Sequence, residues 1–340
     1  AYYGRLKPEP HFGYFCLFVS FFPQLVAGPI ERSQSLLPQL KGLDLATKQQ
    51  FRQGALLIMW GLMLKIVVAD NLTQTITAIY FADSHYSVFM YWLAGLLVSF
   101  KIYCDFMAYS EIARGLALFF GVKLSKNFRR PFLAPNIYEF WQRWHVSLTR
   151  WIGVYINMPL ARRFPKDPQR SLASIVTMTL IGLWHGASWN FVLFGVYHGV
   201  LLATWNPASR LASQFLKVGK VVSVVTSRLV LIFVWITGST MFFIADFDKM
   251  IEVFRLMFQM TGASADPSYN IPYKLPLAKA LLGLSLLTLY SFVAEYRKIE
   301  TVDHVAQSTS VLRWTAFLGL STVILLFGNF EVEDFVYFEF

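Results

Sequence analysis

The sequence predicts an all-α, polytopic membrane protein. Three observations predict this class: 56% of the 340 residues are hydrophobic, only 15% are charged, and the mean hydropathy is +0.47. Soluble domains carry about 25% charged residues, so this composition does not suit one. The apolar residues gather in windows that approach the roughly 20 residues a helix needs to cross about 30 Å of hydrocarbon. We expect seven spans, near residues 54–69, 86–104, 171–185, 189–205, 226–245, 277–294 and 312–329.

The aromatic residues and cysteines fit the same class. The 10 Trp and 16 Tyr suit the belts that amphipathic rings form at membrane interfaces. Cys16 and Cys104 both lie in apolar surroundings, so we expect no disulfide framework and no metal site. The chain opens on Ala1 and shows no signal-peptide pattern, so we expect that further N-terminal residues precede it in nature.

Positive charge is concentrated between residues 123 and 170. Ten Lys and Arg stand there against Glu139 and Asp167, which accounts for +8 of the formal net charge of +10. Short loops rich in Lys and Arg stay in the cytoplasm, so we expect a cytoplasmic or interfacial region. Topology alone and a role in holding an anionic substrate explain this charge equally well.

Within this region, residues 137–148 show helical periodicity. Trp141, Trp144, His145 and Leu148 fall at i, i+3, i+4 and i+7, which predicts that they share one face of a single helix. We expect this helix to lie in the membrane interface or to insert halfway.

Two proline-rich breaks flank apolar sequence. Residues 21–30 contain Pro23 and Pro29, and Pro131 and Pro135 precede the predicted interfacial helix. Non-helical backbone at membrane depth survives only where protein or water satisfies its polar groups. We therefore predict that residues 21–30 form a re-entrant segment and that a cavity opens to the cytoplasm.

Spacings of four residues predict two ion pairs on helices. Glu139 and Arg143 stand at i and i+4, and so do Lys101 and Asp105. Asp105 has an alternative role, which is to orient a histidine.

The most informative motif is Gly-x-aromatic-His-Gly, which occurs twice, at residues 182–186 and 195–199. Glycines four apart let a neighbouring helix approach closely, but this does not explain the histidines. An ionisable side chain in an apolar span is a candidate functional residue, and His185 fits best. His198 follows 13 residues later, about 220° around a straight helix at about 100° per residue, so the two histidines point different ways.

His145 and His185 are the only plausible acid–base pair. A neutral imidazole suits removal of a proton from an alcohol that attacks an activated acyl group. The sequence contains no G-x-S-x-G elbow, no phosphate-binding G-x-x-x-x-G-K-[ST] and no H-E-x-x-H metal motif.

With these motifs in view, the chain resembles the membrane-bound O-acyltransferase (MBOAT) family, in the bacterial branch that O-acetylates alginate or D-alanylates lipoteichoic acid. Residues 327–340 also resemble the end of alginate-type members. Four blocks carry the resemblance, in order: 22–30, 103–110, 139–148 and 183–187.

The resemblance implies a single MBOAT domain over residues 1–340, with helices around a thin funnel where donor and acceptor meet. It implies that His185 is the essential histidine, which we expect to act as general base, and that His145 is a second tunnel residue that orients the reacting groups. The other expected tunnel or substrate-binding residues are Tyr103, Asp105, Trp141, Arg143, Trp144, Trp184 and Asn190. For the phosphates of the donor we predict contacts with Arg129, Arg130, Arg162 and Arg163.

The expected reaction moves an acyl group, preferentially acetyl, from acetyl-CoA or an acyl-carrier thioester, with no bound cofactor. The expected partners are this donor, the lipid bilayer of a bacterial inner membrane, and a glycan acceptor or a periplasmic acyl-accepting protein; no nucleic acid is expected. One alternative is D-alanyl transfer from a carrier protein to teichoic acid. Another is a proton-coupled transporter, which should show two symmetry-related halves that the sequence lacks.

Overall fold

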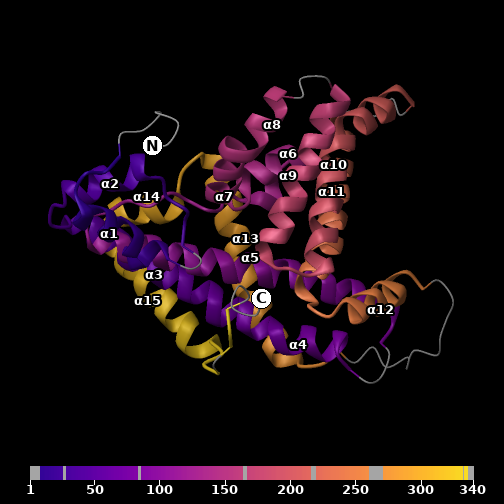
Figure 1. Cartoon of the computed structure of the whole chain (residues 1–340). Coiled ribbons are helices and arrows are strands. Elements are labelled where there is room, and N and C mark those ends of the chain that lie inside the picture. The colour runs from indigo at the N-terminus through magenta and orange to yellow at the C-terminus, as the bar shows by residue number, and fades with distance from the viewer. Residues whose placement is uncertain are drawn as a thin grey trace.

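The fold is a bundle of helices of very different lengths (Figure 1). The computed structural model describes residues 8–25, 28–82, 86–163, 167–215, 220–259, 271–331 and 333–335, and all regular structure in these ranges is helical. All seven predicted spans fall on helices, which confirms the predicted fold class. Among the described residues, five helical segments are long and apolar enough to cross a membrane: Lys48–Tyr80, Val88–Phe119, Val222–Phe243, Lys274–Arg297 and Ser310–Phe327. The predicted spans at 171–185 and 189–205 are helical but are not among these five.

Two long antiparallel rods form the centre of the bundle. The first runs through α3 (Lys48–Leu62), a π-helical segment (Met63–Ala69) and α4 (Asp70–Tyr80), and the second is α5 (Val88–Phe119). Both rods extend well beyond the predicted spans at 54–69 and 86–104, because charged residues interrupt the apolar pattern without ending the helices.

Small residues let the rods approach closely. A Cβ on Gly54 would lie 2.6 Å from the carbonyl oxygen of Gly115, and a Cβ on Gly61 would lie 2.7 Å from that of Ala108. Such contacts are typical of helix pairs in membranes, where close van der Waals packing replaces the hydrophobic driving force.

Charged residues of the two rods form ion pairs with one another. Lys65, in the π-helical segment, places Nζ 2.8 Å from Asp70 and 3.0 Å from Asp105, and both carboxylates are buried. The predicted pairing of Lys101 with Asp105 is wrong, because Lys101 instead donates to Thr73 Oγ1 at 2.9 Å. Asp105 finds its cation on the facing rod, which spacing along one helix does not reveal.

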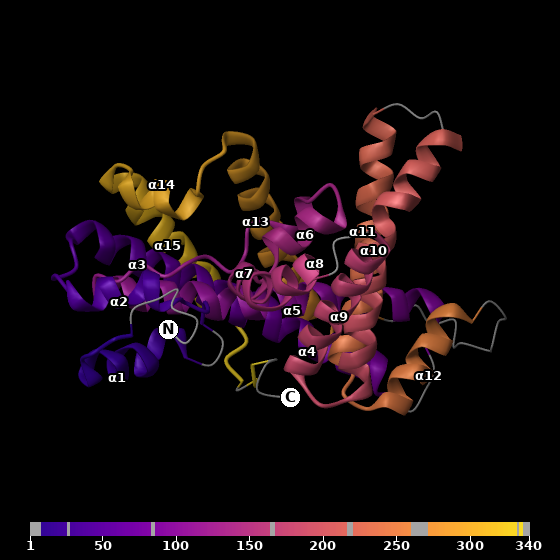
Figure 2. The same cartoon turned by 45° about the horizontal axis from the view of Figure 1, so that its top comes forward.

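A helical hairpin packs on α11 (Lys220–Phe243), which in turn packs on the second rod. Helices α9 (Asp167–His185) and α10 (Trp189–Phe215) lie side by side, and α11 joins α10 to α5 (Figures 1 and 2). The glycines of the repeated motif let α9 and α10 pack closely, since a Cβ on Gly195 would lie 2.4 Å from the carbonyl oxygen of Met178. The close-approach explanation of these glycines is therefore confirmed.

The remaining helices surround this frame. Helix α14 lies against α3, and α13 and α15 pack on the π-helical segment. Their bounds are α1 Phe12–Ser20, α2 Ser33–Lys41, α6 Ile137–Arg143, α7 Val146–Ile152, α8 Met158–Arg163, α12 Phe247–Phe258, α13 Lys274–Arg297, α14 Thr301–Gln307 and α15 Ser310–Phe327.

The two proline-rich breaks are irregular, as their prolines suggest. A short 3₁₀ turn, Phe22–Gln24, follows α1, and another occupies Pro131–Leu133. Residues 26 and 27 of the first break lie outside the described residues. Whether residues 21–30 re-enter the bilayer stays a prediction.

The single helix predicted over residues 137–148 is wrong. Helix α6 ends at Arg143, Trp144 is extended, and α7 begins at Val146. Between them His145 adopts the left-handed conformation, with φ of 41°.

Candidate active site

His145 occupies a strained turn that neighbouring segments hold in place. A left-handed conformation costs a non-glycine residue roughly 1–3 kcal/mol and persists only where the surroundings impose it. The main chain of residues 127–129 provides this constraint: Val146 N donates to the Asn127 carbonyl at 2.9 Å, and Arg129 N donates to the Arg143 carbonyl at 2.9 Å.

A chain of buried side chains reinforces the turn. Asn127 Nδ2 donates to Ser110 Oγ on α5 at 2.9 Å, and Ser147 Oγ donates to Asn127 Oδ1 at 2.6 Å. Ser147 Oγ also accepts from the main-chain N–H of Ile30 at 3.0 Å. The predicted re-entrant segment, α5 and α7 thus converge on the residues that flank His145.

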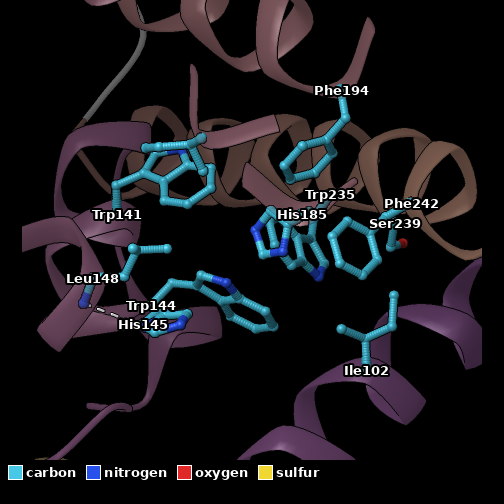
Figure 3. Close-up of a pocket in the computed structure, with 11 residues that line it drawn as sticks. Ile102, Trp141, Trp144, His145, Leu148, His185, Phe194, Trp235, Ser239 and Phe242 are labelled. Carbon is cyan, nitrogen blue, oxygen red and sulfur yellow. Dashed lines mark hydrogen bonds between the residues drawn. The ribbon is translucent and has the colours of Figure 1, made fainter. Parts of the chain in front are cut away.

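The local geometry sets which nitrogen of His145 carries the proton. Leu148 N donates to His145 Nδ1 at 3.4 Å, as at a helix N-cap (dashed in Figure 3). Because Nδ1 accepts, the neutral ring carries its proton on Nε2. The ring is 3% exposed and packs edge-to-face on Phe106, with centroids 4.6 Å apart.

His185 ends α9, at the point where the hairpin turns. Its ring packs edge-to-face on Phe242 of α11 at 4.9 Å and on Trp184 at the same distance. Trp184 also contacts the ring of His145, with centroids 6.3 Å apart. One indole therefore touches both histidines.

The two histidines line one cavity, which we call the histidine cavity (Figure 3). Its volume is about 20 Å³, which is room for about one water molecule. The walls are mostly aromatic, and the imidazoles are the lining groups that can take up a proton. The lining residues are Ile102, Trp141, Trp144, His145, Leu148, Ile181, His185, Phe194, Trp235, Ser239 and Phe242.

The predicted tunnel residues divide into two groups. Trp141 and Trp144 line the histidine cavity, and Trp184 contacts both histidines. Tyr103 lies one layer behind, with its ring 5.8 Å from that of Trp144.

The other predicted tunnel residues face away from this cavity. Asn190 donates to the carbonyls of Ile244 and Ala245, so it ties the start of α10 to the end of α11. Arg143 pairs with Glu139 at 3.2 Å, which confirms that predicted pair, and with Glu295 at 3.3 Å. Asp105 belongs to the Lys65 cluster.

His198 does not line the histidine cavity. It is fully buried on α10, and Phe194 stands between it and His185, with ring centroids 4.6 Å and 6.4 Å away. The two histidines therefore do not share a cavity, as predicted, but the straight helix assumed for that prediction is broken at residues 186–188, between α9 and α10.

The four predicted donor-binding arginines do not form one group. Arg129 and Arg130 line a small second pocket, where Arg130 also pairs with Glu295 at 2.9 Å. Arg162 and Arg163 are exposed on α8. Among the described residues, no group of three His, Cys, Asp or Glu side chains is placed to hold a metal ion.

Three lining residues from α11 were not predicted. Trp235, Ser239 and Phe242 recur about once per turn on the face of α11 that meets the cavity. They belong to an ordinary apolar span, and the sequence gives no signal that sets them apart from lipid-facing residues.

Fold and site together define a multi-pass helical membrane protein with a pair of histidines in a buried aromatic cavity. The family model for MBOAT, the membrane-bound O-acyltransferase family, matches residues 3–245. The chain therefore belongs to the MBOAT family, which is a family of acyltransferases.

Curated relatives carry related names. The chain is 35% identical over 207 residues to a peptidoglycan O-acetyltransferase of Helicobacter pylori, covering 60% of this chain and 39% of that protein. It is 38% identical over 189 residues to a probable alginate O-acetylase AlgI of Azotobacter vinelandii, covering 56% and 38%. A teichoic acid D-alanyltransferase of Bacillus subtilis is 26% identical over 214 residues, covering 60% and 54%. The chain thus spans about two fifths of the length of the first two relatives.

Proposed function

We propose that this chain is the catalytic core of a membrane O-acyltransferase that moves an acetyl group from a thioester donor to a hydroxyl group. One observation carries the proposal: His145 and His185, 40 residues apart in sequence, line the same buried aromatic cavity. Membership of the MBOAT family supports the reaction class.

In the proposed reaction His185 is the general base. A nitrogen of its ring takes the proton of the acceptor hydroxyl as the oxygen attacks the thioester carbon. The tetrahedral intermediate then breaks its carbon–sulfur bond, and the protonated imidazole returns the proton to the departing thiolate. General base catalysis of this kind typically contributes about 10²–10⁴-fold to the rate.

His145 has a different proposed role, as hydrogen-bond donor. Its Nδ1 accepts from Leu148 N, so Nε2–H is the group left to polarise the thioester carbonyl and to stabilise the negative oxygen of the intermediate. The fixed turn supports this role, because a donor that is already oriented needs no rearrangement during the reaction.

Substrate entry requires the lining to move. A volume of about 20 Å³ is far too small for an acyl donor together with an acceptor. Trp184 is 53% exposed, and the chain leaves the helix between Gly186 and Ser188. We propose that this end of the hairpin moves to open the cavity to substrate.

The donor is proposed to enter from the basic end of the bundle. The start of α3 and the end of α5 meet α14 there, beside Lys123, Lys126, Arg129 and Arg130. Because Lys and Arg accumulate on the cytoplasmic side, this end supports a cytoplasmic donor, either acetyl-CoA or an acyl-carrier thioester.

Acetyl is the proposed cargo because the relatives named as O-acetylases are 35–38% identical, whereas the two D-alanyltransferases are 26% and 28% identical. The proposed acceptor is a hydroxyl of a cell-envelope or exopolysaccharide glycan, reached directly or through a periplasmic acyl-accepting protein. The transporter alternative finds no support in the family.

The test is acyl transfer by the full-length protein in inverted membrane vesicles. Labelled acetyl-CoA, or a D-alanyl-loaded carrier protein, is added outside, and label on envelope glycan and protein is measured. We expect incorporation from the acetyl donor only, at a level that vesicles without the protein do not reach. Incorporation from D-alanyl carrier alone would replace the proposed cargo, and none from either donor would refute the proposal.

A further inference from the structure

A polar cavity of about 340 Å³ opens at the basic end of the bundle, apart from the histidine cavity. We call it the polar cavity. Its lining comes from α3, α5, the segment after α5, and α14. The residues used below are Gln53, Arg114, Lys123 and Asp303.

Arg114 forms the junction between this cavity and the small second pocket, which we call the inner pocket. It is a buried cation of α5, at 8% exposure, and it lines both spaces. Its Nη1 pairs with Glu111, while its Nε has no hydrogen-bond partner among the described residues. A buried guanidinium with a spare donor suits a phosphate, which accepts several hydrogen bonds at once.

The charges around these two spaces favour an anion. Among the described residues, five cations line them against three carboxylates, Glu111, Glu300 and Asp303. The carboxylates are already paired: Glu300 and Asp303 share Lys126, at 2.9 Å and 3.7 Å, and Glu111 pairs with Arg114. Asp303 also accepts from Gln53 at 2.6 Å.

Two of these cations are free to bind an anion. Lys123 and Arg129 make no ion pair within the described part of the chain, and both are exposed. The main chain of Lys123 is fixed from both sides by the amide of Gln39, at 2.8 Å and 3.1 Å. Lys123, exposed on a fixed backbone, and the buried Arg114 line the same cavity, so together they provide two cationic contacts for an anion.

The inner pocket leads from Arg114 toward the histidines. Phe128 lines this pocket, and its ring lies 5.0 Å from that of Trp144, which lines the histidine cavity. One layer of aromatic rings therefore separates the anion site from the candidate catalytic site.

Distance along α5 fits a particular ligand. Arg114 and Phe106 are eight residues apart on this helix, about 12 Å at about 1.5 Å per residue. Phe106 contacts His145 at 4.6 Å. The phosphopantetheine arm has about thirteen bonds from phosphorus to sulfur, which reach about 15 Å at the ~3.5 Å that three chain bonds span.

We propose that the polar cavity binds the phosphate of a phosphopantetheine thioester through Arg114 and Lys123, with the arm passing Phe128 to bring the thioester to the histidine cavity. This inference rests on the proposed function for its choice of ligand. Both coenzyme A and acyl-carrier proteins present this arm, so the site accommodates either source.

The test is equilibrium binding to the full-length protein in detergent micelles, with three probes: pantetheine, which lacks phosphate, 4′-phosphopantetheine and coenzyme A. We expect 4′-phosphopantetheine to bind at least about tenfold more tightly than pantetheine, because charge-assisted hydrogen bonds are the strong ones. Tighter binding of coenzyme A than of 4′-phosphopantetheine supports free coenzyme A as the source, and equal binding supports a carrier-borne arm.

Two variants locate the site. Arg114→Lys keeps the charge beside Glu111 but loses Nε, and Lys123→Gln removes an exposed charge without touching its main-chain contacts. Each should reduce the preference for phosphate about threefold or more, whereas the control Lys48→Gln, an exposed lysine outside the lining, should leave it unchanged. An equal affinity for pantetheine and 4′-phosphopantetheine, or an unchanged preference in both variants, would overturn the site.

Binding requires no turnover, so this experiment separates the two proposals. Phosphate-selective binding without any acyl transfer would remove the proposed function and keep the anion site. Acyl transfer without phosphate selectivity would keep the proposed function and remove the anion site.

Discussion

Asn127 holds the His145 turn together, and replacing it with alanine tests that role. Its side chain makes two buried hydrogen bonds, to Ser110 and from Ser147. Each is worth roughly 0.5–1.5 kcal/mol net, and a buried hydroxyl left without a partner costs about 1–3 kcal/mol. Asn127→Ala should therefore destabilise the protein by about 2–4 kcal/mol.

The same substitution should slow acyl transfer. The main-chain bond from Val146 to the carbonyl of residue 127 survives in Asn127→Ala, so only the side-chain support of the turn is lost. His145 then relaxes from a conformation that costs roughly 1–3 kcal/mol, and its ring loses its fixed direction. We expect a fall in transfer rate of about tenfold at matched protein levels.

Tryptophan fluorescence during thermal unfolding in micelles, together with the transfer rate in vesicles, measures both effects. Asn157→Ala is the matched control, because Asn157 is half-buried and its side chain makes one bond, to Thr177 at 3.2 Å. Asn157→Ala should lower the free energy of unfolding by no more than about 1 kcal/mol. If Asn127→Ala were as mild as this control and transferred acetyl at the normal rate, the reasoning about the turn would be refuted.

Two further substitutions test the rods. Lys65→Met removes the cation that Asp70 and Asp105 share, which should cost about 3–5 kcal/mol and abolish a monodisperse peak in size-exclusion chromatography; a normal peak with unchanged melting would contradict this. Gly54→Ala places a methyl group 2.6 Å from a carbonyl oxygen of α5, which should cost about 1–3 kcal/mol in thermal unfolding, whereas Gly319→Ala, with nothing within 4 Å, should cost nothing measurable. Equal melting of the two glycine variants would show that the rods are not in close contact.

The sequence reveals the parts of this fold that depend on local pattern. All seven apolar windows locate helices, five of which are long and apolar enough to cross a membrane, and the Gly-x-aromatic-His-Gly motif predicts that a helix approaches closely and that His185 and His198 do not share a site. These features depend on residues within a few turns of one another, so periodicity and composition are sufficient.

Features set by distant contacts could not be predicted. The left-handed turn at His145 depends on Asn127 and Ser110, and periodicity alone favoured an unbroken helix there. Asp105 pairs with Lys65, 40 residues earlier, rather than with its neighbour one turn away. Trp235 enters the histidine cavity only because α11 packs against α5 and α10.

The central claim is that His185 and His145 form the reactive pair. The most direct measurement is the rate of acetyl transfer by His185→Gln, His145→Gln and His198→Gln at matched membrane levels. His198 is the control, since it is a buried histidine of the same hairpin that does not line the cavity. We predict a loss of about 10²–10⁴-fold for His185→Gln, a smaller loss for His145→Gln, and a near-normal rate for His198→Gln. A normal rate for His185→Gln, or an equal loss for His198→Gln, would contradict the account.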